Sequence, residues 1–264
     1  MKKKLKGFTI IEVSLFLAIT GLIFLGVTFG VQSSVFRQRF NDSVQSFAEF
    51  LRSIYAETMN VQNAESGRSM QAIYGKLVTF GEEYGFSGEW VDGNQAFMYD
   101  IVGEINKDVG SGGNILDALK GANADVAIKE SGKAPRLAGI VESFKPKWSS
   151  QIQQACTSPA TCYTRPIKAA LLIVRHPKSG TVYTYVMNNK TIPVNEKMKT
   201  LSSGGNILKP YLTTANFQPS QIDFCINPEG NKEYNNRANV RITANARNSS
   251  AIEIIYDVGV NECK

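Results

Sequence analysis

A short charged leader at the start of the chain is followed by a long apolar segment. From Phe8 to Val31, a stretch of 24 residues, only Thr, Ser, Gly and Glu12 interrupt the hydrophobic side chains. At about 1.5 Å per residue, a helix of this length exceeds the roughly 30 Å hydrocarbon core of a bilayer. The pattern therefore predicts a transmembrane helix at residues 8–31.

Behind the apolar segment, hydrophobic residues recur at steps of three and four, with charged and amide side chains between them. This spacing is typical of an amphipathic helix with one buried face. No proline interrupts the chain from Phe8 to Asn60, so we expect one helix over residues 8–60, whose second half packs on a globular head. The expected apolar positions are Val35, Phe36, Phe40, Val44, Phe47, Leu51, Ile54, Tyr55 and Thr58.

Past Asn60 the chain becomes rich in Gly, Ser and Asn, and short runs of Val, Ile, Tyr and Thr alternate with turn residues. Such runs predict strands, and two pairs of them, at residues 167–187 and 239–257, predict antiparallel hairpins. The expected fold is α+β, with an antiparallel sheet on the second half of the long helix and a head at 61–264. The predicted strands are Lys76–Phe80, Ile167–His176, Thr181–Met187, Ile222–Ile226, Asn239–Ala244 and Ala251–Asp257.

Residues 92–139 fit this pattern less well. They carry helix-like stretches at Ala96–Lys107 and Ile115–Leu119 and no strong strand signal. We therefore interpret 92–139 as an insertion that decorates the head.

The net charge of +6 is unevenly distributed along the chain. Four of the 29 basic residues are leader lysines, namely Lys2, Lys3, Lys4 and Lys6. The positive-inside rule places this leader in the cytoplasm and the head outside. Residues 37–128 hold 7 basic and 13 acidic side chains, whereas 129–209 hold 13 basic and 3 acidic ones. The basic region indicates either an acidic partner or lysines solvated on loops.

Four cysteines lie far behind the apolar segment, in the part of the chain expected outside the cytoplasm. An even number of cysteines in an exported region favours disulfides, and four cysteines allow three pairings. The simplest pairing joins Cys156 to Cys162 across a short loop and Cys225 to Cys263 at the C-terminus. A zinc site is not indicated, because there is no CxxC and the single histidine, His176, precedes Pro177 in an apparent turn.

Glu12 is the one ionisable residue of the apolar segment. A carboxylate in a membrane helix costs roughly 2.5 to 3.5 kcal/mol on insertion scales, so it indicates a function. The string Lys6-Gly7-Phe8-Thr-Ile-Ile-Glu12-Val, with the long helix behind it, resembles the start of the type IV pilin superfamily, which includes pilus subunits and pseudopilins. The alternative is an ordinary single-span protein whose Glu12 snorkels to the cytoplasmic face.

The resemblance implies particular roles for these residues. A prepilin peptidase would cut after Gly7, the new N-terminal residue Phe8 would be N-methylated, and residues 1–7 would be the leader. Glu12 would pair with the N-terminal amine of a neighbouring subunit during assembly. This role is physically reasonable, because a buried carboxylate and a buried ammonium each stabilise the charged form of the other.

The C-terminal region, from Cys225 onward, resembles more loosely the end of the minor pilins called FimT or GspH. In some of these a basic C-terminal element contacts DNA, which here implies Arg237, Arg241 and Arg247 as possible DNA-binding residues. The same region carries Glu229, Glu233, Glu253 and Asp257, so surface arginines in a solvated hairpin are the alternative.

No catalytic constellation is present in the sequence. His176 has no triad partners by motif, and there is no HExxH, nucleophile elbow or phosphate-binding loop. We therefore predict neither an enzyme nor a bound cofactor or metal. The aromatic residues of YGFSGEW and TVYTYV are expected to fill the core of the head or an interface rather than to bind sugar.

These observations predict a structural subunit of a type IV pilus or related filament, and the size of the head favours a minor pilin. Its partners would be other pilin subunits, the prepilin peptidase and, before assembly, membrane lipid. It would first sit in the cytoplasmic membrane as a single-pass protein and then in a surface pilus or an extracytoplasmic pseudopilus. The alternatives are a tip subunit that recognises DNA or a cell-surface ligand, and a pseudopilin of type II secretion.

Overall fold

The computed structural model describes residues 9–60, 72–80, 94–103, 115–116, 127–129, 142–154, 167–176, 179–188, 211–227 and 237–256. The chain divides into two compact units, Met1–Asp42 and Ser43–Lys264. One helix, α1 (Ile10–Met59), belongs to both of them. The predicted long helix is thus confirmed over its described length.

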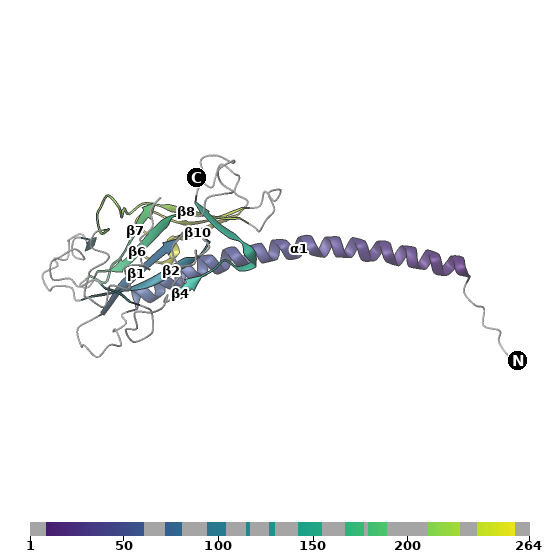
Figure 1. The fold of residues 1–264 in the computed structure, drawn as a ribbon, viewed down its shortest axis with the longest axis horizontal. Helices are drawn as coiled ribbons and strands as arrows, with labels where there is room; N and C mark the ends of the chain where they lie inside the picture. The colour runs from purple at the N-terminus through teal and green to yellow at the C-terminus, as the bar shows by residue number, and fades with distance from the viewer. Residues whose placement is uncertain are drawn as a thin grey trace, which may run out of the picture. The chain divides into compact units, whose positions relative to one another are not determined.

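The described strands of the second unit form two antiparallel sheets (Figure 1). The larger sheet has the order β3-β2-β1-β6-β7, with β4 also paired to β2, and the smaller has the order β10-β9-β8-β5. The strands of the larger sheet are β1 (Ala72–Phe80), β2 (Ala96–Gly103), β3 (Ala127–Lys129), β4 (Glu142–Phe144), β6 (Ala169–Arg175) and β7 (Val182–Asn188). Those of the smaller sheet are β5 (Gln151–Gln154), β8 (Ile222–Asn227), β9 (Ala238–Ile242) and β10 (Ile252–Tyr256).

Short 3₁₀ turns at Lys147–Ser149 and Ser249–Ala251 precede β5 and β10. Both predicted hairpins are present, as β6–β7 and β9–β10. The fold class is therefore α+β, with a helix packed on antiparallel sheet, as the sequence predicts.

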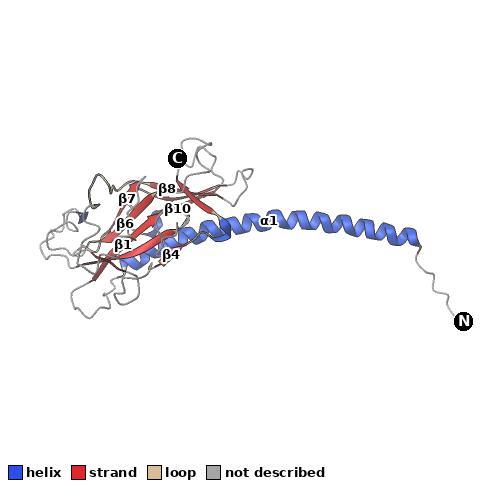
Figure 2. Cartoon of the chain, viewed as in Figure 1, coloured by secondary structure: helices blue, strands red, loops and turns tan. Residues whose placement is uncertain are grey.

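The C-terminal part of α1 supplies the centre of the head's core (Figure 2). The expected apolar positions Val44, Phe47, Leu51, Ile54 and Tyr55 are completely buried. The ring of Phe47 lies 5.3 Å from that of Phe224 on β8 and 6.2 Å from that of Phe80 on β1. Both sheets therefore pack on this part of the helix.

A second layer of core lies on the other face of the larger sheet. It is built from alternate residues of β1, β2, β6 and β7, which include Leu77, Tyr99, Leu172 and Tyr185. Ile115, Leu116, Leu212 and Phe217 complete this cluster. The larger sheet is thus buried on both faces, and the seven residues of β6 include six buried ones in a row. Such continuous burial explains why these strands are apolar throughout rather than alternating.

The prediction of a helix at Ala96–Lys107 is wrong over residues 96–103, the part of it that the structure describes. Residues 96–103 form β2, which pairs with β1 along its whole length and with β3 and β4 on its other side. The run AFMYDIVG shows no alternation of apolar and polar residues, because both faces of the strand are covered. A short apolar run without such a pattern does not distinguish a helix from a buried strand. This part of the expected insertion is therefore an integral strand of the larger sheet.

Candidate functional site

Glu12 closes a capping box in the first turn of α1. Its Oε2 accepts hydrogen bonds from the backbone N of Thr9 at 2.9 Å and from Thr9 Oγ1 at 3.0 Å. In return, the backbone N of Glu12 donates to Thr9 Oγ1 at 3.3 Å. These bonds satisfy donors that the start of a helix leaves without intrahelical partners. The Thr-x-x-Glu spacing at residues 9–12 is the sequence signal for this box. Gly7 and Phe8, the expected cleavage and methylation positions, lie outside the described residues.

The helix that follows Glu12 presents an apolar surface. Ile10, Leu22 and Phe24 are 88%, 71% and 72% exposed, and the other large apolar side chains whose burial the structure describes in this stretch are exposed as well. Among the described residues, α1 is the one helix long and apolar enough to span a membrane. An apolar surface of this extent marks a membrane or protein interaction surface.

The three arginines suspected of binding DNA have different environments. Arg237 is only 4% exposed, and Arg241 on β9 pairs with Asp223 on β8 through an Nε to Oδ1 distance of 2.7 Å. Arg247, in the loop between β9 and β10, is exposed. The structure therefore does not bring the three together as a set of exposed cations.

Of the four cysteines, the described residues include only Cys225. It lies on β8, is 3% exposed and is disulfide-bonded. Cys156, Cys162 and Cys263 lie outside the described residues, so the pairing stays a prediction.

The described part of the chain holds no group of His, Cys, Asp and Glu side chains that could bind a metal ion. His176 is buried in the turn between β6 and β7, where its Nδ1 accepts a hydrogen bond from the backbone N of Ser179 at 3.2 Å. Its role in the described structure is therefore to shape this hairpin turn.

A buried cluster of charges joins α1 to the larger sheet, and the sequence did not reveal it. Lys76 on β1 is 1% exposed, and its Nζ lies 2.8 Å from Glu57 Oε2 on α1 and 2.5 Å from Asp100 Oδ1 on β2. Burial disfavours the charge of Lys76, but hydrogen bonds and charges from Asp100 and Glu57 outweigh it and raise the pKa of Lys76 above its ordinary value. The cluster therefore holds a charged lysine inside the head.

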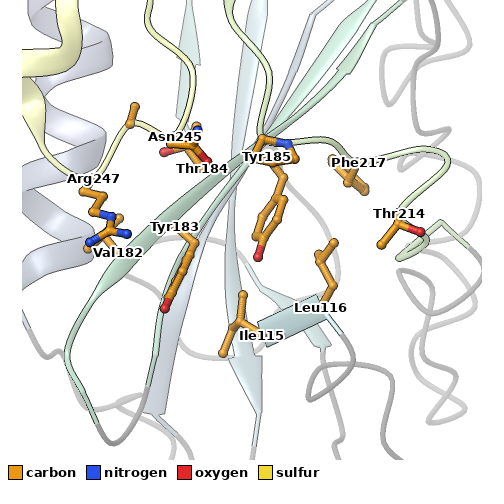
Figure 3. Close-up of a pocket in the computed structure, with 12 residues that line it drawn as sticks. Ile115, Leu116, Val182, Tyr183, Thr184, Tyr185, Thr214, Phe217, Asn245 and Arg247 are labelled. Carbon is orange, nitrogen blue, oxygen red and sulfur yellow. The ribbon is translucent and has the colours of Figure 1, made fainter. Parts of the chain in front are cut away.

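An open pocket of about 510 Å³ lies beside β7 (Figure 3). Tyr183 and Tyr185 point from β7 toward Ile115 and Leu116, while the loop that carries Asn245 and Arg247 approaches the strand from its other side. The two tyrosine rings are 6.5 Å apart and nearly parallel. The lining residues are Ile115, Leu116, Val182, Tyr183, Thr184, Tyr185, Thr214, Phe217, Pro219, Asn245, Ala246 and Arg247.

The aromatic residues of TVYTYV belong in part to the core, as the sequence predicts. Tyr185 is 8% exposed and is a member of the core cluster, and Tyr183 packs against it. The sequence could not show that Arg247, more than sixty residues further along the chain, lines the same pocket as Tyr183.

No protein-family model matches this chain, and neither the curated proteins nor the solved structures contain a significant match.

Proposed function

We propose that this chain is a structural subunit of a type IV pilus or a related filament, and a minor pilin rather than the main repeating subunit. The observation that supports this proposal is the change of surroundings along α1. Its first part exposes apolar side chains around a single carboxylate, and its last part is the core of a globular head. A membrane anchor needs only the first of these features, whereas a pilin-like subunit uses both.

Assembly would transfer the exposed apolar part of α1 from lipid to a bundle of identical or related helices. Lipid and apolar side chains are similar surroundings, so packing and polar contacts decide such transfers. Glu12 would supply the polar contact, by pairing with the N-terminal amine of a neighbouring subunit. In the structure its carboxylate bonds to Thr9, which keeps the charge hydrogen-bonded while no neighbour is present.

The first test is mass spectrometry of the N-terminus of the protein from cells. The proposal predicts a cut after Gly7 and one added methyl group on Phe8. An intact N-terminus at Met1 would show an ordinary anchored protein instead.

The second test separates the assembly role of Glu12 from its capping role. We expect Glu12→Ala to be processed normally and to be absent from filaments. Thr9→Ala removes the capping box but keeps the carboxylate, so it serves as the matched control and should still enter filaments. Equal incorporation of both variants and the wild type would refute the role of Glu12.

Two alternatives share the same N-terminal helix. A tip subunit that recognises DNA or a cell-surface ligand would need exposed recognition residues, and Arg247 is the one of the three suspected arginines that is exposed. This alternative would be favoured if the protein bound DNA in a salt-dependent way and Arg247→Ala weakened that binding. A pseudopilin of type II secretion would be processed in the same way, and loss of secretion without loss of surface filaments on deletion would favour it. In all three cases we propose that the protein is not an enzyme.

A further inference from the structure

The contacts of β10 with α1 show which end of the smaller sheet lies where the helix enters the head. Arg52 of α1 donates a hydrogen bond to the backbone oxygen of Ile252, at the start of β10. Gln45 of α1 donates one to the hydroxyl of Tyr256, at the end of β10. Strand β10 therefore runs along α1 toward Ser43, the first residue of the second unit. We call the end of the head that holds Gln45 and Tyr256 the entry end.

Strand register places the turn between β4 and β5 at the entry end. Ala238 on β9 lies opposite Tyr256 on one side and opposite Ile226 of β8 on the other. Ile226 lies opposite Ile152, the second residue of β5. Strand β5 therefore begins at the entry end, and the turn Lys147–Ser149 directly precedes it.

The strand on the other side of this turn ends in the same region. Phe144 is the last residue of β4, and its ring lies 5.5 Å from that of Phe47 and 4.8 Å from that of Phe50, measured between centroids. Phe47 follows Gln45 by two residues on α1. Both strands that flank the turn therefore place it at the entry end.

The turn combines exposed lysines with a half-exposed indole. Lys145 and Lys147 are exposed, and the side chain of Trp148 is 50% exposed. Trp148 and Ser149 have φ angles of 56° and 53°, in the left-handed region that residues with a side chain adopt at a cost in free energy. Strain of this kind is retained where the conformation has a use. The conformation of an exposed tryptophan therefore indicates a contact outside the chain.

A second aromatic side chain is exposed at the entry end. From Ser43 onward, the described large apolar side chains that are exposed are Met59, Trp148 and Tyr256. Met59 ends α1 at the opposite end of the head. Trp148 and Tyr256 flank opposite edges of the smaller sheet, whose four strands at a spacing of about 4.8 Å put them roughly 14 Å apart. Tryptophan and tyrosine are enriched where membranes meet water.

The entry end lies close to the apolar part of α1 along the helix. Exposed apolar side chains continue to Phe36, and Ser43 follows seven residues later, a rise of roughly 10 Å. The headgroup layer of a bilayer is roughly 5 to 7 Å thick, and membrane helices tilt by about 20° on average. Long side chains at the entry end therefore come within reach of lipid headgroups.

We propose that the turn at 145–149, together with Tyr256, binds anionic phospholipid headgroups and holds the head against the membrane surface. Lys145 and Lys147 meet the phosphates, while the rings of Trp148 and Tyr256 enter the interfacial layer. Among the described residues, no acidic side chain forms an ion pair with either lysine. The proposal rests on the membrane anchoring by α1 proposed above, but not on assembly into a filament.

The test measures lipid contact from the fluorescence of Trp148. The chain has one other tryptophan, Trp90, so the full chain with Trp90→Phe is placed in nanodiscs of phosphatidylglycerol and phosphatidylcholine. The lipids carry bromine, a short-range quencher, on the shallow part of their acyl chains. We expect bromine to lower the emission of Trp148 at least twofold. If Trp90→Phe fails to fold, the difference in quenching between wild type and Trp148→Phe gives the same quantity.

Two control positions are tested in a background that lacks both native tryptophans. Phe24→Trp lies in the apolar part of α1 and should be quenched strongly, which shows that the helix is inserted. Met59→Trp lies at the other end of the head and should keep its emission.

Charge variants and lipid composition test the role of the lysines. Lys147→Glu should weaken the quenching of Trp148 at least twofold. Arg247→Glu reverses a charge at an exposed residue of the β9–β10 loop, away from the entry end, and should leave the quenching unchanged. Nanodiscs of phosphatidylcholine alone should quench Trp148 at least twofold less than anionic ones.

The outcomes separate this proposal from the proposed function. Quenching of Phe24→Trp without quenching of Trp148 would overturn the headgroup contact and leave the anchor and the N-terminal processing standing. No quenching at either position would overturn the anchor, and this proposal with it. Equal quenching of Trp148 in neutral and anionic nanodiscs would refute recognition of anionic lipid. A residue 148 that is unquenched in nanodiscs but cross-links to neighbouring subunits in filaments would make the turn a subunit interface instead.

Discussion

Lys76 shows how a single residue departs from the expectation for its type. Lysine is almost never fully buried unless it is paired, and here the pairing comes from two different elements. Asp100 lies directly opposite Lys76 in the register of β1 and β2, and Glu57 reaches it from α1. Neither partner is close to Lys76 in sequence, so the residue looks like an ordinary surface lysine until the chain is folded.

Replacement of Lys76 should therefore be costly. We expect Lys76→Met to lower the free energy of unfolding by about 3 to 5 kcal/mol, because Asp100 remains buried without its cation. In the double variant Lys76→Met/Asp100→Leu most of that loss should be recovered. Denaturant unfolding of the full chain in detergent measures the free energy of unfolding of the single and the double variant. A single variant as stable as the wild type would show that the cluster contributes nothing.

Gly75 shows a second constraint at the residue scale. It sits at a register shift between β1 and β2, and a Cβ atom there would lie 2.7 Å from the Cα of Val174 and closer still to the carbonyl oxygen of Ile173. Both of these atoms belong to the backbone of β6 and cannot turn aside.

We expect Gly75→Ala to destabilise the head by about 1 to 3 kcal/mol, the usual range for overpacking. The exposed helix residue Ser53 provides the control, since Ser53→Ala should change stability by no more than about 0.5 kcal/mol. The readout is the denaturation midpoint of each variant. Equal midpoints for Gly75→Ala and wild type would mean that β1 and β6 separate easily at this position.

At the scale of elements, the C-terminal part of α1 is held by contacts of two kinds. The ring of Phe50 stacks on Phe144 of β4. The ring of Phe47 contacts Phe144 at a tilt and meets Phe224 of β8 edge to face. Beside this aromatic cluster, the hydroxyl of Tyr55 shares a hydrogen bond of 2.8 Å with Thr184 on β7. The helix is therefore joined to both sheets by apolar rings and to the larger sheet by a buried polar bond.

The burial of the Tyr55 hydroxyl predicts that the stability of the head is sensitive to alkali. Burial raises the pKa of Tyr55 to about 12 from an ordinary value of 10.0, against the opposing effect of the bond to Thr184. Above pH 10 the unfolded chain therefore loses a proton that the folded protein keeps, and stability falls as the pH rises toward 12. Lys76 acts in the same direction, because its raised pKa means that the folded protein holds the proton more tightly.

We expect the raised pKa of Tyr55 to lower the free energy of unfolding by about 2 to 3 kcal/mol at the alkaline end of this pH range. Thermal or denaturant unfolding between pH 9 and 12 measures it, and Tyr55→Phe should flatten the curve. An identical pH dependence in Tyr55→Phe would show that Tyr55 is not responsible.

At the scale of the whole molecule, the two units differ in how far they expose their apolar side chains. The described large apolar side chains of residues 10–31 are exposed, whereas most of the described apolar side chains from Ser43 onward are buried around two sheets. The second unit is also the one that carries the cysteines. A disulfide in an exported domain typically contributes about 2 to 4 kcal/mol of stability.

We predict that digestion of the unreduced protein from cells yields Cys225 linked to Cys263 and Cys156 linked to Cys162. Reduction should lower the unfolding midpoint, because β8 would lose its covalent link. Peptide mapping by mass spectrometry identifies the pairs. A link from Cys225 to either Cys156 or Cys162 would contradict the predicted pairing.

The sequence by itself determined the elements whose pattern is local. Helix α1 follows from an apolar run and a repeat of three and four, because these periods reflect the geometry of one helix. The hairpins β6–β7 and β9–β10 follow from turn residues between two apolar runs, since their partners are adjacent in the chain. The candidate residues Gly7, Phe8 and Glu12 likewise come from one short string.

Only the tertiary structure decided the features that depend on distant residues. The run AFMYDIVG becomes a strand because β1, β3 and β4 offer it partners, and no local signal distinguishes it from a helix. The charge cluster of Lys76, Glu57 and Asp100 and the pocket shared by Tyr183 and Arg247 arise in the same way. Local patterns report the conformation of one segment, whereas burial and pairing are set by whichever segments the fold brings against it.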